Sequence, residues 1–131
     1  NTDFSAIRGP EGKSCCHNHV LFGNEGEKVW SIPYDFDQAG IVDAPYAAPA
    51  PQYRIRNVKQ RLYLGRCIHN DYLDDAIAVY QDRRDAMFAV FNELDMARNR
   101  NVKTMENYVE KFYKTLNSER RVNGNLIKGC K

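Results

Sequence analysis

Apolar residues in the second half of the chain recur at intervals of three and four positions, the spacing of one face of an α-helix. In the first such stretch they are Leu73, Ile77, Tyr80, Met87, Val90, Phe91 and Leu94. The stretch opens with Asp71, Asp74 and Asp75, and the helix dipole favours negative charge in a first turn. The pattern predicts one helix that begins at Asp71, has Asn70 as its N-cap, and is interrupted at residues 99–101.

A second helical stripe follows at the same spacing. It consists of Met105, Tyr108, Val109, Phe112, Tyr113 and Leu116. Thr104 precedes the stripe and is its expected N-cap. A third, short helix is expected around Val122, Leu126 and Ile127. We interpret these stripes of aliphatic and aromatic residues as the packed core of a helical scaffold.

The first third of the chain follows a different pattern. His19–Phe22 and Val29–Tyr34 are short runs with β-branched and aromatic residues, joined by the turn-rich sequence Gly-Asn-Glu-Gly-Glu. Two such runs predict a β-hairpin. Because both faces of the second run carry apolar side chains, we expect the hairpin to lie against a core. The proline-rich residues 36–57 predict an irregular segment rather than a helix.

These elements indicate an α+β, mainly helical fold, and 131 residues suit one compact unit. The apolar fraction of 43% and the charged fraction of 27% are typical of a soluble globular protein. A net charge of +2 is too small to indicate nucleic acid or an anionic membrane as a partner. No apolar run reaches the roughly 18 residues of a membrane span. The opening NTDFSAIRGP lacks a signal-peptide pattern, although a signal removed upstream leaves the compartment open.

The chain has four cysteines: Cys15, Cys16, Cys67 and Cys130. They allow three pairings, and one of these joins Cys67 to Cys130 as a staple for the final helix in an oxidising compartment. The alternative is a set of buried thiols in a cytosolic protein.

The sequence Cys-Cys-His-Asn-His at residues 15–19 allows two further interpretations. The first is a zinc site of Cys15, Cys16, His17 and His19, although neighbouring cysteines rarely both ligate one ion. The second is a His-Asn-His nuclease motif. Here, however, the predicted hairpin follows the motif, and His69 is the only other histidine downstream.

A third interpretation starts from the ligands of Mg²⁺, which are hard oxygen atoms of carboxylates, amides, water and phosphates. Asn18 opens the first predicted strand and Asp35 follows the second, so a hairpin brings them close together. Asp3, further upstream, supplies a carboxylate that can orient an attacking hydroxyl. The order Asp, Asn, Asp is the order of these groups in protein kinases.

On these residues the chain resembles a known family. NTDFS, CCHNHVLF and WSIPYDFDQAG, within residues 1–46, are similar to the catalytic segment of atypical protein-kinase-like proteins, above all the spore-coat kinase CotH and its bacterial relatives, and more distantly HipA. The resemblance implies that Asp3 is the catalytic-loop Asp, Asn18 the metal-binding Asn and Asp35 the Asp of the Asp-Phe-Gly motif. Asp37 replaces the glycine of that motif and is a second candidate metal ligand. The implied cofactors are Mg²⁺ and ATP.

The resemblance implies a single kinase C-lobe-like unit over residues 1–131, in which the β-hairpin carries the metal-site residues and packs on a helical bundle. Residues 1–46 form its catalytic and metal segment. Residues 47–69 form a basic loop like an activation segment, and residues 70–131 form the helical scaffold.

The basic loop contains Arg54, Arg56, Lys59, Arg61 and Arg66. Arg54, Arg56 and Arg61 are candidate ligands of a phosphate or acidic substrate, because guanidinium groups bind oxyanions bidentately. Arg54 and Arg56 share a face if that part of the backbone is extended. The alternative is a solvated basic face that pairs in part with the three aspartates at residues 71–75.

The implied function is transfer of a phosphoryl group from Mg-ATP to a hydroxyl of a protein or small-molecule acceptor. The Gly-rich loop and the Lys–Glu pair that clamp ATP in kinases have no counterpart in this sequence, so an N-lobe or a companion fragment is the expected partner. The resemblance also implies a secreted or periplasmic bacterial protein, with a cytoplasmic location as the alternative. Two other functions stay open: a non-catalytic pseudokinase-like or interaction domain, and a small disulfide- or zinc-stabilised binding protein.

Overall fold

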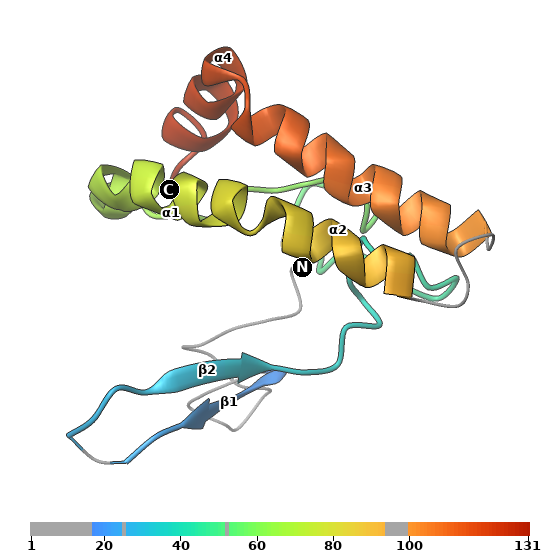
Figure 1. Cartoon of the computed structure of the whole chain (residues 1–131), viewed down its shortest axis with the longest axis horizontal. Coiled ribbons are helices and arrows are strands. Elements are labelled where there is room, and N and C mark those ends of the chain that lie inside the picture. The colour runs from blue at the N-terminus through green and yellow to red at the C-terminus, as the bar shows by residue number, and fades with distance from the viewer. Residues whose placement is uncertain (1–16, 25, 52, 94–99) are drawn as a thin grey trace. The chain divides into compact units, whose positions relative to one another are not determined.

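The computed structural model describes residues 17–24, 26–51, 53–93 and 100–131 (Figure 1). The fold is α+β. It divides into two compact units, Asn1–Arg61 and Leu62–Lys131, which we describe separately. The single kinase C-lobe-like unit therefore stays a prediction.

The first unit contains the predicted hairpin. Strands β1 (His19–Phe22) and β2 (Trp30–Pro33) pair antiparallel, with His19 opposite Pro33 and Phe22 opposite Trp30 (Figure 1). Gly26 has a φ of 83°, a backbone conformation that glycine adopts without the steric cost a Cβ atom imposes. The predicted hairpin is confirmed, with the second strand one residue shorter at each end.

The described residues of the first unit leave the apolar side chains of the hairpin exposed, and a core against which it packs stays a prediction. In β1, Val20 is 52% exposed and Phe22 67%; in β2, Trp30 is 57% exposed and Ile32 49%. Successive side chains of a strand point to opposite faces, so apolar residues on both faces need a covering layer on each side. No second sheet or helix is present among the described residues of this unit to supply such layers.

Residues 34–51 and 53–61 form turns, in part held by side chain–backbone hydrogen bonds, which confirms an irregular segment. Gln38 Oε1 accepts a hydrogen bond of 3.0 Å from the backbone N–H of Ala48. Asn57 Oδ1 accepts from the N–H groups of Lys59 and Gln60, at 3.1 and 3.2 Å. Short side-chain acceptors of this kind replace regular backbone pairing in loops.

The second unit begins with a 3₁₀-helix, η1 (Cys67–Tyr72), followed by α1 (Leu73–Asp82) and α2 (Arg84–Glu93). The prediction of one helix from Asp71 is therefore wrong in two respects: the helix breaks at Arg83, and its first turn is 3₁₀. Asn70 is not the N-cap, because it lies inside η1, while Tyr72 occupies the cap of α1 without a side-chain hydrogen bond.

The next helix, α3 (Arg100–Leu116), matches the second stripe and lies beside α2 (Figure 1). Thr104 is not its cap: it lies inside the helix, four residues after Arg100, and its hydroxyl donates a hydrogen bond of 2.9 Å to the carbonyl of Arg100. The short α4 (Glu119–Val122) continues into a π-helical turn, η2 (Asn123–Ile127), as expected for a third helix.

The described part of the helical unit has its core along α3. The buried apolar residues are Phe91, Val102, Val109, Tyr113, Leu116 and Val122. The core interpretation therefore holds for the second stripe. Among the described residues of the first stripe, which exclude Leu94, it fails at two positions, because Tyr80 and Val90 are 46% and 54% exposed.

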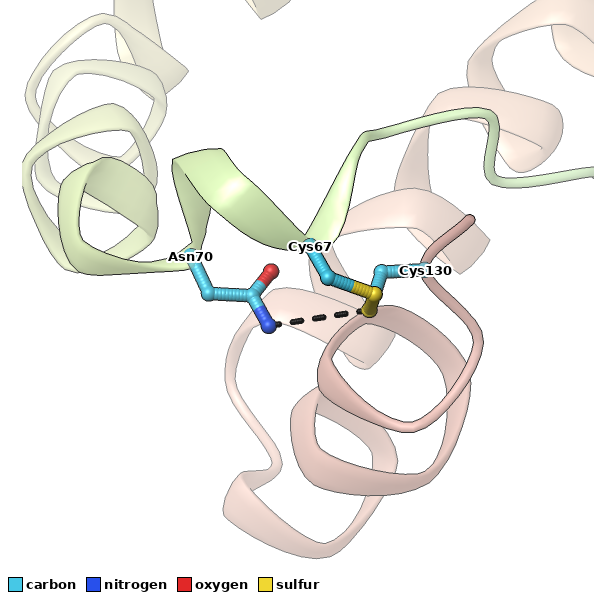
Figure 2. Close-up of a disulfide and its surroundings, with 3 residues drawn as sticks. All are labelled: Cys67, Asn70 and Cys130. Atoms are coloured by element: carbon cyan, nitrogen blue, oxygen red, sulfur yellow. Dashed lines mark hydrogen bonds between the residues drawn. A yellow bond between two sulfur atoms is a disulfide. The ribbon is translucent and has the colours of Figure 1, made fainter.

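A disulfide joins Cys67 to Cys130, with their Cα atoms 5.1 Å apart (Figure 2). This pairing is one of the three that the four cysteines allow, and it is the staple predicted for the final helix. Cys15 and Cys16 lie outside the described residues.

Candidate functional site

Two of the predicted metal ligands lie at the same end of the hairpin. The backbone N–H of Tyr34 donates a hydrogen bond of 3.0 Å to the carbonyl oxygen of Asn18, which extends the strand ladder by one rung. Asp35 is the next residue after Tyr34. Asn18 and Asp35 therefore lie at the same end of the hairpin, and their shared role as metal ligands stays a prediction.

The backbone of both residues is left-handed. Asn18 has a φ of 53° and Asp35 a φ of 56°. This conformation is unfavourable for most L-residues, and Asn and Asp tolerate it better than others do. Asn18 is buried, at 8% exposure, whereas Asp35 is exposed. Two such residues at one end of one hairpin form a specific local geometry, of the kind that clusters at ligand sites.

The donor atoms in this part of the chain are the hard oxygen atoms that Mg²⁺ requires. They are the amide oxygen of Asn18 and the carboxylates of Asp35 and Asp37. Asp37 is half-buried, and its Oδ2 lies 3.4 Å from Gln38 Nε2. The donor set fits Mg²⁺, which keeps several water ligands and needs few protein oxygens. Asp3, the predicted catalytic residue, lies outside the described residues.

The zinc interpretation gains no support from the part of the chain that the structure describes. Within it, no three His, Cys, Asp or Glu residues gather into a group able to hold a metal ion. Cys15 and Cys16, half of the predicted zinc set, are not described.

Sequence reasoning missed a pair formed by His19 and Ser31. Ser31 Oγ lies 2.8 Å from His19 Nδ1, while His19 Nε2 is buried without a hydrogen-bond partner. His19 lies opposite Pro33, so Ser31 is its diagonal neighbour on the same face of the sheet. The alternation of side chains along the two strands indicates which residues share a face of the sheet. Only the register of the strands shows that His19 and Ser31 are neighbours on that face.

The basic loop does not have the extended backbone that would align Arg54 with Arg56. The N–H of Ile55 donates to the carbonyl of Tyr53 at 2.9 Å, which closes a three-residue turn centred on Arg54. Both arginines are exposed, as is Arg61. Lys59 forms a 2.7 Å ion pair with Asp43 of the same unit. The proposed role of the arginines in phosphate binding stays a prediction.

Comparison of the chain with protein-family models, curated proteins and solved structures finds no match. Within the described residues, every helix is too short or too polar to cross a membrane.

Proposed function

We propose that this chain is a portion of an atypical kinase-like phosphotransferase, and that the end of the hairpin holds the Mg²⁺ of Mg-ATP. The observation that carries the proposal is the position of Asn18 and Asp35 at the same end of the hairpin, where Asn18 pairs with Tyr34, the residue before Asp35. The Tyr34–Asn18 backbone hydrogen bond brings them to one end of the hairpin, and both residues have positive φ. The family resemblance of residues 1–46 supports the same assignment.

In this proposal each residue has a separate role. Asp35 and Asn18 hold the metal ion through a carboxylate and an amide oxygen, and Asp37 assists from two residues further on. Asp3 orients the acceptor hydroxyl by accepting its proton. The metal ion, when bound, neutralises negative charge on the phosphoryl oxygens. The protein groups act by positioning and electrostatics, because phosphoryl transfer requires little covalent participation from the protein.

Mn²⁺ provides a direct test, because it substitutes for Mg²⁺ and broadens NMR signals of nearby nuclei. We expect titration of the full chain with Mn²⁺ to broaden the side-chain amide signals of Asn18 before those of Asn57, and excess Mg²⁺ to reverse the effect. Asp35→Asn should abolish this selective broadening.

Asp43→Asn is the matched control. Asp43 lies in the same unit, is also acidic and also has a positive φ, of 52°. Equal broadening in the Asp35 and Asp43 variants would contradict the proposed site. Selective broadening that survives in the Asp43 variant and is lost in the Asp35 variant would support it. Binding of Mg-ATP is then measured after an N-lobe has been added.

A disulfide-stabilised binding module without catalysis is the second candidate. The Cys67–Cys130 cross-link favours it, since small domains with limited cores use such links for stability. Absence of any selective Mn²⁺ effect, with the fold intact, would favour this candidate.

A further inference from the structure

The disulfide fastens a segment that is otherwise lightly held. Residues 123–131 contain η2 and the chain beyond it, and only Leu126 and Cys130 among them are half-buried, the others being exposed. Two backbone hydrogen bonds join Lys131 to residues 65–67: its N–H donates to the carbonyl of Gly65 at 2.9 Å, and its carbonyl accepts from the N–H of Cys67 at 3.0 Å. Because so little apolar surface is buried, the disulfide is an important constraint on this segment.

The two cysteine residues of the disulfide have different surroundings. Cys67 is an exposed residue, whereas Cys130 is half-buried. Asn70 Nδ2 donates a hydrogen bond of 3.7 Å to Cys130 Sγ, as Figure 2 shows. Asn70 Oδ1 is buried and has no hydrogen-bond partner. The amide group is therefore held with its N–H toward the sulfur of Cys130, and a donor of this kind stabilises negative charge there.

Thiol–disulfide exchange depends on which sulfur is accessible and on how well the leaving sulfur accepts charge. Both conditions select the same direction here. Cys67 is the more exposed residue, so we expect a small thiolate to attack it, and Cys130 is the leaving sulfur toward which the Asn70 amide donates.

We propose that Cys67–Cys130 is an exchangeable disulfide that releases residues 123–131 when an external low-molecular-weight thiol attacks Cys67. The thiolate sulfur forms a bond to Cys67 Sγ, the Cys67–Cys130 bond breaks, and its electron pair passes to Cys130 Sγ, which then takes up a proton. A second thiol attacks the sulfur of the first at Cys67, forms the oxidised dimer of the reagent, and leaves Cys67 as a thiol. The disulfide is thereby reduced and two molecules of thiol are oxidised. This inference does not depend on the proposed phosphotransferase function.

The test uses reduced glutathione on the full chain, with acid quenching, alkylation by N-ethylmaleimide and peptide mass mapping. We expect the glutathione adduct on Cys67 and the maleimide on Cys130. An adduct found mainly on Cys130, or shared equally, would overturn the proposed direction of attack. Peptide mapping separates both from adducts on the two cysteines at 15 and 16.

Asn70→Asp tests the role of the amide, because it keeps the size of the side chain and replaces the N–H donor by a carboxylate. We expect exchange at Cys67 to slow at least several-fold. Gln81→Glu is the matched control on exposed α1 and should leave the rate unchanged. Equal rates in the Asn70 variant and the native chain would remove Asn70 from the mechanism.

Hydrogen exchange tests the release itself and needs no variant. After reduction, we expect the amides of residues 123–131 to lose at least tenfold more protection than the amides in the central turns of α3. Unchanged exchange in residues 123–131 would show that the other contacts hold the segment, and would overturn the proposal of release.

Discussion

The hydroxyl of Tyr113 donates a hydrogen bond of 2.9 Å to the backbone carbonyl of Tyr80. Tyr80 lies in the last turn of α1, where helix carbonyls lack regular backbone partners. Tyr113 is only 1% exposed and also lies 3.7 Å from Met87 Sδ in α2. One side chain of α3 therefore contacts both helices on either side of the break at Arg83.

Tyr113→Phe should lower the free energy of unfolding by about 1 kcal/mol, because it removes this hydrogen bond and keeps the packed ring. Urea denaturation of the native chain and the variant measures the difference. Tyr72→Phe is the control, since Tyr72 is 68% exposed and its change should have little effect. Equal losses in the two variants would show that the buried hydroxyl contributes nothing specific.

The stability should also depend on alkaline pH through the same residue. Burial raises the pKa of Tyr113 above its ordinary value of 10.0, with smaller contributions from Tyr80 and Asp85, although the nearby Arg84 acts in the opposite direction. The folded state therefore keeps the proton that the unfolded state loses, so stability is fully present below pH 10.0 and falls as the pH rises toward the folded pKa. In Tyr113→Phe this part of the pH dependence of the unfolding free energy should disappear. A variant with the same alkaline decline as the native chain would assign the decline to other groups.

Arg84 should be sensitive to a charge-conserving substitution. Its guanidinium donates to Glu110 Oε2 at 3.0 Å and lies 4.5 Å from the centre of the Phe88 ring. Lysine keeps the charge but loses the planar stacking, so Arg84→Lys should cost about 0.5–1 kcal/mol, a modest figure because the pair is partly exposed. Arg83→Lys is the control, since its ion pair with Asp82 is about three-quarters exposed on both sides. The thermal unfolding temperature of Arg84→Lys should be lower than that of Arg83→Lys. The reverse order would contradict the stacking argument.

Removal of the disulfide should destabilise the helical unit. The cross-link spans 63 residues, and a loop of that size is worth roughly 4 kcal/mol through the entropy of the unfolded chain. Cys67→Ser combined with Cys130→Ser should lose about this amount in chemical denaturation. The reduced native chain should match the double variant, and a large difference between them would show that the serine substitutions perturb the fold themselves.

Asp35 allows its backbone and side-chain roles to be separated. Glycine accepts a φ of 56° freely, whereas a β-branched residue does not. Asp35→Gly should therefore keep the hairpin, while Asp35→Val should lose about 1–2 kcal/mol or shift its end. Both variants should lose selective Mn²⁺ broadening. Cross-strand NMR contacts between His19 and Pro33 measure the hairpin independently of the metal.

The helical stripes and the hairpin were predictable because local periodicity carries them. The apolar spacing of Val109, Tyr113 and Leu116 predicts a buried face, and α3 buries all three. Alternation and a turn-rich linker likewise predicted β1 and β2. The position of Asn18 and Asp35 at one end of the hairpin followed from the same pattern, since a strand–turn–strand segment brings its two ends together.

The break between α1 and α2 was not predictable, because Asp82, Arg83 and Arg84 are all compatible with a continuous helix. Two contacts with α3 surround this break: Tyr113 donates to the carbonyl of Tyr80, and Arg84 donates to Glu110. Both partners in α3 are far away in the sequence, so local patterns do not reveal them. Asn70 illustrates the same point, since its spacing is that of an N-cap but its amide contacts Cys130.

The sequence by itself thus determined the type and order of the elements, because periodicity and turn residues act over a few positions. Only the tertiary structure decided which surfaces are covered. The apolar residues of β1 and β2 read as buried, yet they are exposed, since burial depends on whether another layer is present and not on the strand itself. The pairing of Cys67 with Cys130 is likewise a tertiary choice among three, because a disulfide requires two Cα atoms at suitable separation and local sequence does not encode that distance.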